Sequence, residues 1–251
     1  MKYFIIASAL FILQGTLQAF EPGQLSLDSV SNFKAGDAGF SIRHRFYGKA
    51  KDTDTFYGLD EGANTYLSLR YAIFESLIIK THHTSNKSEN SIGLAYVHKF
   101  EYLNTQFNAN YFSFKESGLS NEDRSNAFVN IVLQSPLLYK HLIITSNLGY
   151  DNYYSASGAG LGLEFSTQNF FPKALTFTQS LSFLAEYYTK YDDVQDFKRD
   201  HNAYAFGVKF STYAHHFELL LTNSTGVDAR TMYQGTNTND LHFAFNINRK
   251  F

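Results

Sequence analysis

Residues 156–166, with the sequence ASGAGLGLEFS, alternate between two kinds of side chain. Ala159, Leu161, Leu163 and Phe165 are apolar, while the positions between them hold glycines and Glu164. Because successive side chains of a β-strand point to opposite faces, this segment is predicted to be a strand with one apolar face and one small or polar face. A strand of this kind separates lipid from a lumen in a transmembrane β-barrel.

The same period of two residues recurs in segments of about ten residues, the length that spans a bilayer when tilted. We expect twelve strands, an even number, as single-chain bacterial outer-membrane barrels have. Their predicted ranges are 40–47, 64–71, 77–82, 92–99, 105–114, 125–134, 141–150, 156–166, 175–188, 202–212, 215–223 and 240–251. The predicted fold is therefore all-β: an antiparallel up-and-down transmembrane β-barrel over residues 39–251.

The predicted connections support this fold independently. The connections after odd-numbered strands are generally long and polar: 48–62, 85–90, 115–124, 151–155, 189–201 and 224–239. Those after even-numbered strands are mostly short: 74–76, 101–104, 135–140, 167–174 and 213–214. Outer-membrane barrels have short periplasmic turns and longer extracellular loops, which places both termini in the periplasm. A soluble β-sandwich also alternates, but it would explain neither this regularity nor the segment length.

The composition excludes several other classes of protein. The 251 residues are 17% aromatic and 18% charged, contain no Cys and carry a net charge of −2. Such a chain has ample apolar surface to fold, lacks any thiolate metal site and shows no excess of positive charge for a nucleic-acid partner. The pairs His82-His83 and His215-His216 offer one ligand per strand face only, so we expect no metal site and no cofactor.

The first 19 residues have the pattern of a signal peptide. Lys2 precedes an apolar run over residues 3–13, and a small residue, Ala19, marks the expected cleavage point. An anchor helix is the alternative, but the polar residues of 14–18 leave too few apolar positions to span about 30 Å. We therefore predict export to the bacterial outer membrane, followed by a periplasmic N-terminal segment over residues 20–38.

The last predicted strand has the most specific local pattern. Its apolar face ends in a terminal aromatic, and it comprises Leu241, Phe243, Phe245, Ile247 and Phe251. A terminal aromatic on an alternating strand resembles the assembly signal of bacterial outer-membrane proteins. That resemblance implies the barrel-insertion machinery and periplasmic chaperones as partners, with membrane lipid and lipopolysaccharide around the folded barrel. The strand has to pair with the first strand, because unpaired backbone groups in lipid cost several kcal/mol.

Two motifs in the first third of the mature chain resemble an uncharacterised family of bacterial outer-membrane β-barrels. Residues 40–46 read F-S-I-R-H-R-F, matching an F-x-x-x-H-R-F strand, and a barrel strand follows at 67–71. Between them, residues 56–60 read F-Y-G-L-D, which departs from the family's F-G-L-D loop by one inserted residue. The resemblance implies the same barrel fold and no particular activity.

Charged residues at the predicted inward positions suggest what the lumen could do. They are Arg43, Arg45, Arg70, Lys80, Lys99, Lys209 and Lys250 against Glu164, Glu186 and Glu218. If the lumen is open, this basic lining favours anions, so a narrow channel or small-solute transporter with mild anion preference is the leading hypothesis. The alternative is a closed barrel with a structural or surface-interaction role, in which these charges pair with one another.

A second alternative is an outer-membrane lipid esterase or deacylase. Residues 83–86 read His-Thr-Ser-Asn, and the His-x-Ser-Asn spacing resembles that of outer-membrane phospholipases and lipid A deacylases. His83 and Ser85 share a strand face, so the imidazole could act as a base toward the hydroxyl, with Asn86 beside it. The same residues are equally typical of a polar junction between a strand and a loop. An enzyme is the less favoured prediction.

Overall fold

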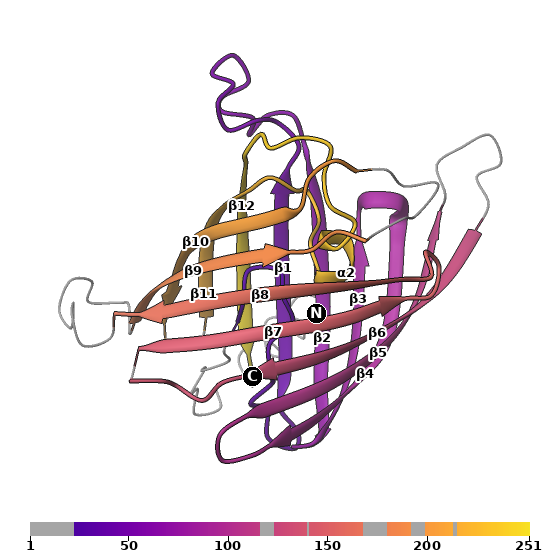
Figure 1. Ribbon diagram of the computed structural model, residues 1–251, viewed down its shortest axis with the longest axis vertical. Helices are drawn as coiled ribbons and strands as arrows, with labels where there is room; N and C mark the ends of the chain where they lie inside the picture. Colours follow the sequence, from indigo (N-terminus) through magenta and orange to yellow (C-terminus); the bar gives the residue numbers. More distant parts are fainter. Residues whose placement is uncertain (1–22, 116–122, 140, 168–179, 192–198, 213–214) are drawn as a thin grey trace, which may run out of the picture.

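The computed structural model describes residues 23–251 apart from 116–122, 140, 168–179, 192–198 and 213–214, and it forms one closed barrel of twelve antiparallel strands (Figure 1). The strands are β1 (Ala38–Phe46), β2 (Ala63–Phe74), β3 (Leu77–Thr84), β4 (Glu89–Lys99), β5 (Asn104–Lys115), β6 (Asp123–Gln134), β7 (Leu142–Asp151), β8 (Ala156–Ser166), β9 (Ser180–Tyr188), β10 (Ala203–Ser211), β11 (His215–Thr222) and β12 (His242–Lys250). Each strand pairs with its neighbours in sequence, and β1 pairs with β12 to close the ring. The prediction of a twelve-stranded up-and-down barrel is confirmed.

Most strand boundaries lie within a few residues of those predicted from the period of two. The first part of the predicted strand 175–188 falls outside the described residues, where β9 is described only from Ser180. The connection after the even-numbered strand β2 is as short as predicted, at residues 75–76. The connection after the odd-numbered strand β1 is long, at residues 47–62. One predicted long connection is shorter, because only residues 85–88 join β3 to β4 and three of them form the 3-10 turn η1 (Asn86–Ser88).

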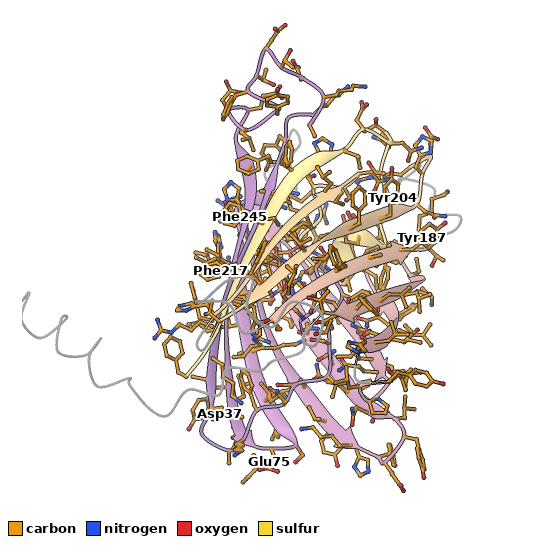
Figure 2. All side chains as sticks on the ribbon, turned by 90° about the vertical axis from the view of Figure 1, so that its left-hand side faces the viewer. Asp37, Glu75, Tyr187, Tyr204, Phe217 and Phe245 are labelled. Carbon is orange, nitrogen blue, oxygen red and sulfur yellow. The ribbon has the colours of Figure 1, made fainter. Side chains whose placement is uncertain are left out.

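Exposure follows the same alternation. On β8 the side chains of Leu161, Leu163 and Phe165 are exposed, whereas the residues between them are buried. Figure 2 shows apolar side chains such as Phe217 and Phe245 on the outer surface of the barrel, while Asp37 and Glu75 lie at the end formed by the short turn between β2 and β3. A soluble barrel would not expose so many large apolar side chains, so this surface faces lipid. In the described part of the chain, no helix is long and apolar enough to cross a membrane.

The seam between β1 and β12 ends at the last residue of the chain. The strands pair from Gly39 opposite Lys250 to Arg45 opposite Ala244. Phe251 continues this ladder, since its backbone N–H donates to Ala38 O at 2.8 Å and its carbonyl accepts from Ala38 N at 3.2 Å. The terminal aromatic therefore lies at the closing seam.

The described part of the N-terminal region differs most from expectation. The sequence predicts a periplasmic segment over residues 20–38, but residues 23–33 lie inside the barrel, in contact with inward-facing side chains from β1, β5, β6, β7, β9, β10 and β12. Leu25, Leu27, Val30 and Phe33 are all almost completely buried. We call residues 23–34 the N-terminal segment. The predicted cleavage near Ala19 lies outside the described residues.

A second element enters the lumen from the connection between β11 and β12. Residues 223–241, which we call the lumen loop, contain the short helix α2 (Ala229–Met232), seen within the barrel in Figure 1. Asp228 caps this helix by accepting hydrogen bonds from the backbone N–H and the hydroxyl of Thr231. Val227, Met232 and Tyr233 are fully buried. The barrel interior is thus filled by two separate parts of the chain.

Candidate functional site

Side chains of the lumen wall bind the N-terminal segment mainly at the backbone groups of the segment. The N–H of Ser26 donates to Glu186 Oε2 at 2.9 Å, that of Val30 to Gln134 Oε1 at 2.9 Å, and that of Ser31 to Gln106 Oε1 at 2.9 Å. Asn147 makes both kinds of bond to Asp28: its Oδ1 accepts from the backbone N–H and its Nδ2 donates to the carbonyl. Buried backbone groups require such partners. The side chains of the wall therefore satisfy the backbone groups that a neighbouring strand would satisfy in a sheet.

Basic side chains bind the carbonyl groups of the same segment. Arg45 Nη2 donates to Leu25 O at 3.0 Å, Arg43 Nη1 donates to Ser26 O at 3.2 Å, and Lys209 Nζ donates to Gly23 O at 3.2 Å. Arg45 is completely buried and also donates to Asn246 Oδ1 at 2.7 Å. Part of the lumen charge predicted from the sequence is therefore used to bind this segment.

Apolar contacts add to these hydrogen bonds. The described residues form three buried apolar clusters, and each contains at least one side chain of the N-terminal segment. Leu27 packs in the cluster with Tyr188 and Tyr233, Leu25 in the cluster with Leu184 and Ala244, and Val30 and Phe33 in the cluster with residues of β2, β3, β4 and β6. Burying side chains of this size contributes about 1.5–3 kcal/mol each. The interior is a packed core built around the segment.

The inward-facing glycines of β8 make room for these elements. A Cβ at Gly158 would lie 2.4 Å from the Tyr233 ring, and one at Gly160 would lie 2.5 Å from Leu27 Cδ2. A Cβ at Gly162 would lie 2.8 Å from both Gln24 Oε1 and Leu27 Cδ1. The glycine face of β8, which helped to identify this strand in the sequence, is therefore also the surface on which the N-terminal segment and the lumen loop pack.

The remaining predicted lumen charges divide between the two sides of the barrel. Lys209 pairs with Glu164 at 2.6 Å, and Glu186 and Glu218 accept hydrogen bonds from Tyr188 and Asn246. These carboxylates belong to β8, β9 and β11, whereas Arg43, Arg70 and Lys80 belong to β1, β2 and β3. Lys99 is exposed at the end of β4. Lys250 pairs with Asp37 at 2.7 Å. Of the predicted lumen charges, the three carboxylates therefore lie on β8, β9 and β11, and we call the part of the wall formed by β1, β2 and β3 the basic side.

A cavity of about 80 Å³ lies between the N-terminal segment and the basic side. Arg70 and Lys80 face it from directly paired positions on β2 and β3, and Arg43 faces it from β1. We call these three residues the basic wall. Among the described lining residues, the strands contribute no Asp or Glu, and both carboxylates, Asp28 and Asp228, come from the elements inside the barrel. A cavity of this size and polarity holds several water molecules.

Asp28, the one carboxylate of the N-terminal segment, is linked to the basic wall through Asn108. Its Oδ2 accepts from Asn130 Nδ2 at 2.8 Å and from Asn108 Nδ2 at 3.5 Å. Asn108 Oδ1 in turn accepts from Lys80 Nζ at 3.0 Å. The segment thus places a negative charge where the basic wall attracts one.

His83 and Ser85 lie on the outer side of the barrel at the end of β3, and both are exposed. His83 Nδ1 lies 3.0 Å from Asn90 Oδ1, and Ser85 Oγ accepts from the N–H of Thr65 at 2.9 Å. The described geometry contains no hydrogen bond between His83 and Ser85. Asn86 donates its N–H to Asn64 Oδ1. The esterase hypothesis gains no support from this arrangement and stays a prediction.

Sequence reasoning missed the N-terminal segment and the lumen loop. Two signals could have indicated them: the excess of Asn and Gln at inward positions, whose amides match a peptide backbone, and the glycine positions of β8. The lumen loop also carries a buried tyrosine, Tyr233, whose pKa is raised by its burial.

Comparisons with known proteins agree with the fold. The KdgM porin, solved in complex with disordered oligogalacturonate, superposes with a TM-score of 0.52 at 9% identity, covering 85% of this chain and 99% of its own. The NanC porin superposes with a TM-score of 0.50 at 10% identity, covering 84% of this chain and 98% of its own. No curated protein sequence matches the chain significantly. Residues 22–251 match the family model described as membrane bound beta barrel domain (DUF5777), and the chain belongs to this family.

Proposed function

We propose that the protein is an outer-membrane channel for small anionic solutes, which the N-terminal segment closes in the conformation described here. The observation that carries this proposal is the basic wall: three cations from adjacent strands face one cavity. Arg70 and Lys80 are directly paired across β2 and β3, and like charges at such positions are destabilising unless an anion lies between or near them.

In this proposal the N-terminal segment is the one of the two lumen-filling elements that can leave, while the lumen loop stays. It is continuous with the start of β1 through residues 35–37 only, so it can leave the barrel without breaking a strand pair. Its departure would free Arg43, Arg45 and Lys209 from its carbonyl groups and remove Asp28 from the basic side. The lumen would then be wider and more positive. The porin KdgM, which shares the fold, was solved with an acidic oligosaccharide, and this also supports passage of anions.

Conductance in planar bilayers tests the proposal. We expect the full mature chain to give small or rare steps and a variant lacking residues 24–33 to give larger steps. Under a KCl gradient the reversal potential of the deletion variant should indicate anion preference, because positive charge in a narrow pore selects for anions. Replacing Arg43, Arg70 and Lys80 together by Gln in that variant should abolish the preference.

Two results would count against a channel for anions. If the deletion variant, shown to be folded by its strand content in circular dichroism, gave no conductance, the closed structural barrel would be the better hypothesis. If it conducted with the same reversal potential before and after neutralisation of the basic wall, the anion preference would be wrong.

A further inference from the structure

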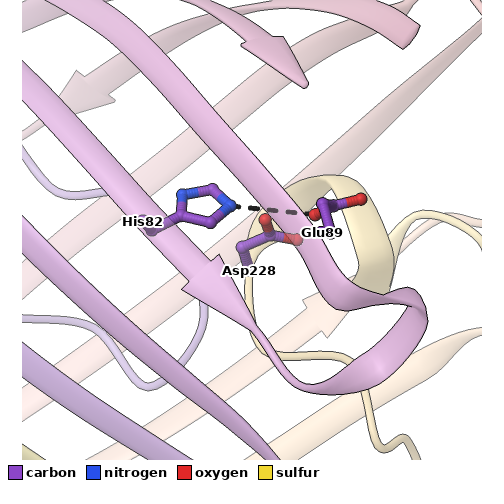
Figure 3. Close-up of side chains that lie close together, drawn as sticks. All are labelled: His82, Glu89 and Asp228. Atoms are coloured by element: carbon purple, nitrogen blue, oxygen red, sulfur yellow. Dashed lines mark ion pairs between the residues drawn. The ribbon is translucent and has the colours of Figure 1, made fainter. Parts of the chain in front are cut away.

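Three side chains, two from neighbouring strands and one from the lumen loop, lie close together. His82 on β3, Glu89 at the start of β4 and Asp228 of the lumen loop each offer a donor atom, and these atoms lie within 4.8 Å of one another (Figure 3). His82 Nε2 lies 3.7 Å from Glu89 Oε1. The side chains of His82 and Glu89 are only 10% and 6% exposed, and Asp228 is half-buried.

Each of the three residues is fixed through its other polar atom. His82 Nδ1 bonds Ser91 Oγ at 2.8 Å, Asp228 Oδ1 accepts from Thr231, and Glu89 Oε2 pairs with Arg230. The atoms left over are His82 Nε2, Glu89 Oε1 and the second carboxylate oxygen of Asp228. His82 Nε2 is buried and makes no hydrogen bond. Partners that orient a ligand through its second atom are characteristic of metal sites in proteins.

The charges of the cluster are unbalanced. Glu89 and Asp151 are buried and Asp228 is half-buried, and among the described residues Arg230 is the cation that pairs with Glu89 and, at 3.8 Å, with Asp151. The guanidinium also stacks on the Phe112 ring at 4.3 Å, so it is held at its place. The two carboxylates of the cluster, Glu89 and Asp228, thus share the single positive charge of Arg230, and an uncompensated charge in a largely buried setting is costly.

We propose that His82, Glu89 and Asp228 bind one divalent transition-metal ion of the Zn²⁺ class. One imidazole nitrogen and two carboxylate oxygens suit such an ion, whereas Mg²⁺ and Ca²⁺ prefer oxygen donors alone. Ligands of a tetrahedral Zn²⁺ lie roughly 3.4 Å apart, so the three atoms have to close by about 1 Å. Asp228 belongs to a loop, and a small movement of it suffices. His82 and Asp228 also line the cavity, which gives the ion a path to the site.

The site joins the lumen loop to the wall. Two ligands come from β3 and β4 and one from residues 223–241, so a bound ion would cross-link elements that are otherwise joined here by Arg230. Bound metal should therefore raise the thermal midpoint of the folded barrel, since a ligand that binds only the folded state stabilises it.

The test uses the full mature chain without a polyhistidine tag, refolded in detergent and freed of metal by a chelator. Co²⁺ is added while visible absorption is recorded, and Zn²⁺ and Mg²⁺ are tested as competitors. We expect one Co²⁺ per chain, displaced by Zn²⁺ and not by Mg²⁺. His82→Asn and Asp228→Asn should each weaken binding at least tenfold, since loss of a partner that only orients a ligand already costs about 10–100-fold.

His83→Asn is the matched control, because it removes a neighbouring imidazole that faces the outside of the barrel. It should bind Co²⁺ like the unaltered chain and show the same rise in thermal midpoint. Absence of Co²⁺ binding, equal binding by the His82 variant, or displacement by Mg²⁺ as readily as by Zn²⁺ would each overturn the proposal. Should His82→Asn fail to fold, Asp228→Asn, which alters only the loop, decides the result in the same way.

Discussion

Enlarging the inward glycines of β8 should expel the N-terminal segment. In Gly160→Val the first added carbon would lie 2.5 Å from Leu27 Cδ2 and 3.2 Å from Tyr188 Cδ1. Carbon atoms pack at about 3.5–4.0 Å, so Leu27 has to move by roughly 1 Å or leave. Overpacking of this kind costs about 1–3 kcal/mol, and most of the cost falls on the closed state, because Leu27 is the nearest contact. Because 1.4 kcal/mol is a factor of ten, the released population should rise roughly 5- to 140-fold.

The chain contains no cysteine, so a single introduced thiol reports release of the segment. Val30 is 2% exposed inside the barrel, and Val30→Cys alters its volume little. We expect a membrane-impermeant maleimide to label this thiol slowly in the parent chain and faster in Gly160→Val, in proportion to the released population. Conductance should rise in the same variant.

Ala159→Val is the matched control for this measurement. It creates the same valine side chain one position away, adding two carbons where Gly160→Val adds three, on the face of β8 that points away from the lumen. Equal labelling rates in the parent chain and in Gly160→Val would refute the reasoning, as would an equal increase in Ala159→Val, since the effect would then come from general destabilisation of β8.

Three further predictions concern the middle and the ends of the barrel. Arg45→Met leaves buried acceptors such as Asn246 Oδ1 without their donor, so the free energy of unfolding should fall by about 2–4 kcal/mol; urea unfolding followed by circular dichroism would show no shift if the guanidinium contributes nothing. Deletion of Phe251 removes the last backbone pair of the closing seam and should impair membrane assembly; normal amounts of folded protein in outer membranes would contradict this. Hydrogen bonds from Lys49 and Lys51 hold the pKa of Asp240 well below its usual range, so this contact stabilises the loops above about pH 3.9 and is lost only as the pH falls further; a carboxyl NMR titration with a midpoint near 3.9 would contradict it.

The basic wall shows how far sequence reasoning reached into the lumen. Arg43, Arg70 and Lys80 were assigned to the inside from the period of two, and the structure places them around one cavity. That their side chains point inward follows from their positions in the alternation along each strand, which is a local property. Their partners do not follow from it: Arg45 was expected to pair with carboxylates or to line a pore, and it binds the backbone of residues 23–34 instead.

The candidate metal site shows where such reasoning ends. Adjacent histidines on a strand were expected to provide no site, because His82 and His83 face opposite sides, and they do face opposite sides. The ligands that meet His82 come from the next strand and from Asp228, 146 residues along the chain. No spacing in the sequence records a contact that exists only after the lumen loop folds inward.

Alternation along the chain was enough to predict the wall of this protein: twelve strands, and for each strand the face that meets lipid and the face that meets the lumen. Alternation is local, since each strand has to satisfy the same two environments along its own length. What fills the barrel depends on contacts that form only when the chain folds. Closing the ring brings side chains from both halves of the chain around one axis, and there the N-terminal segment and the lumen loop find partners for their backbone groups that no single strand could provide.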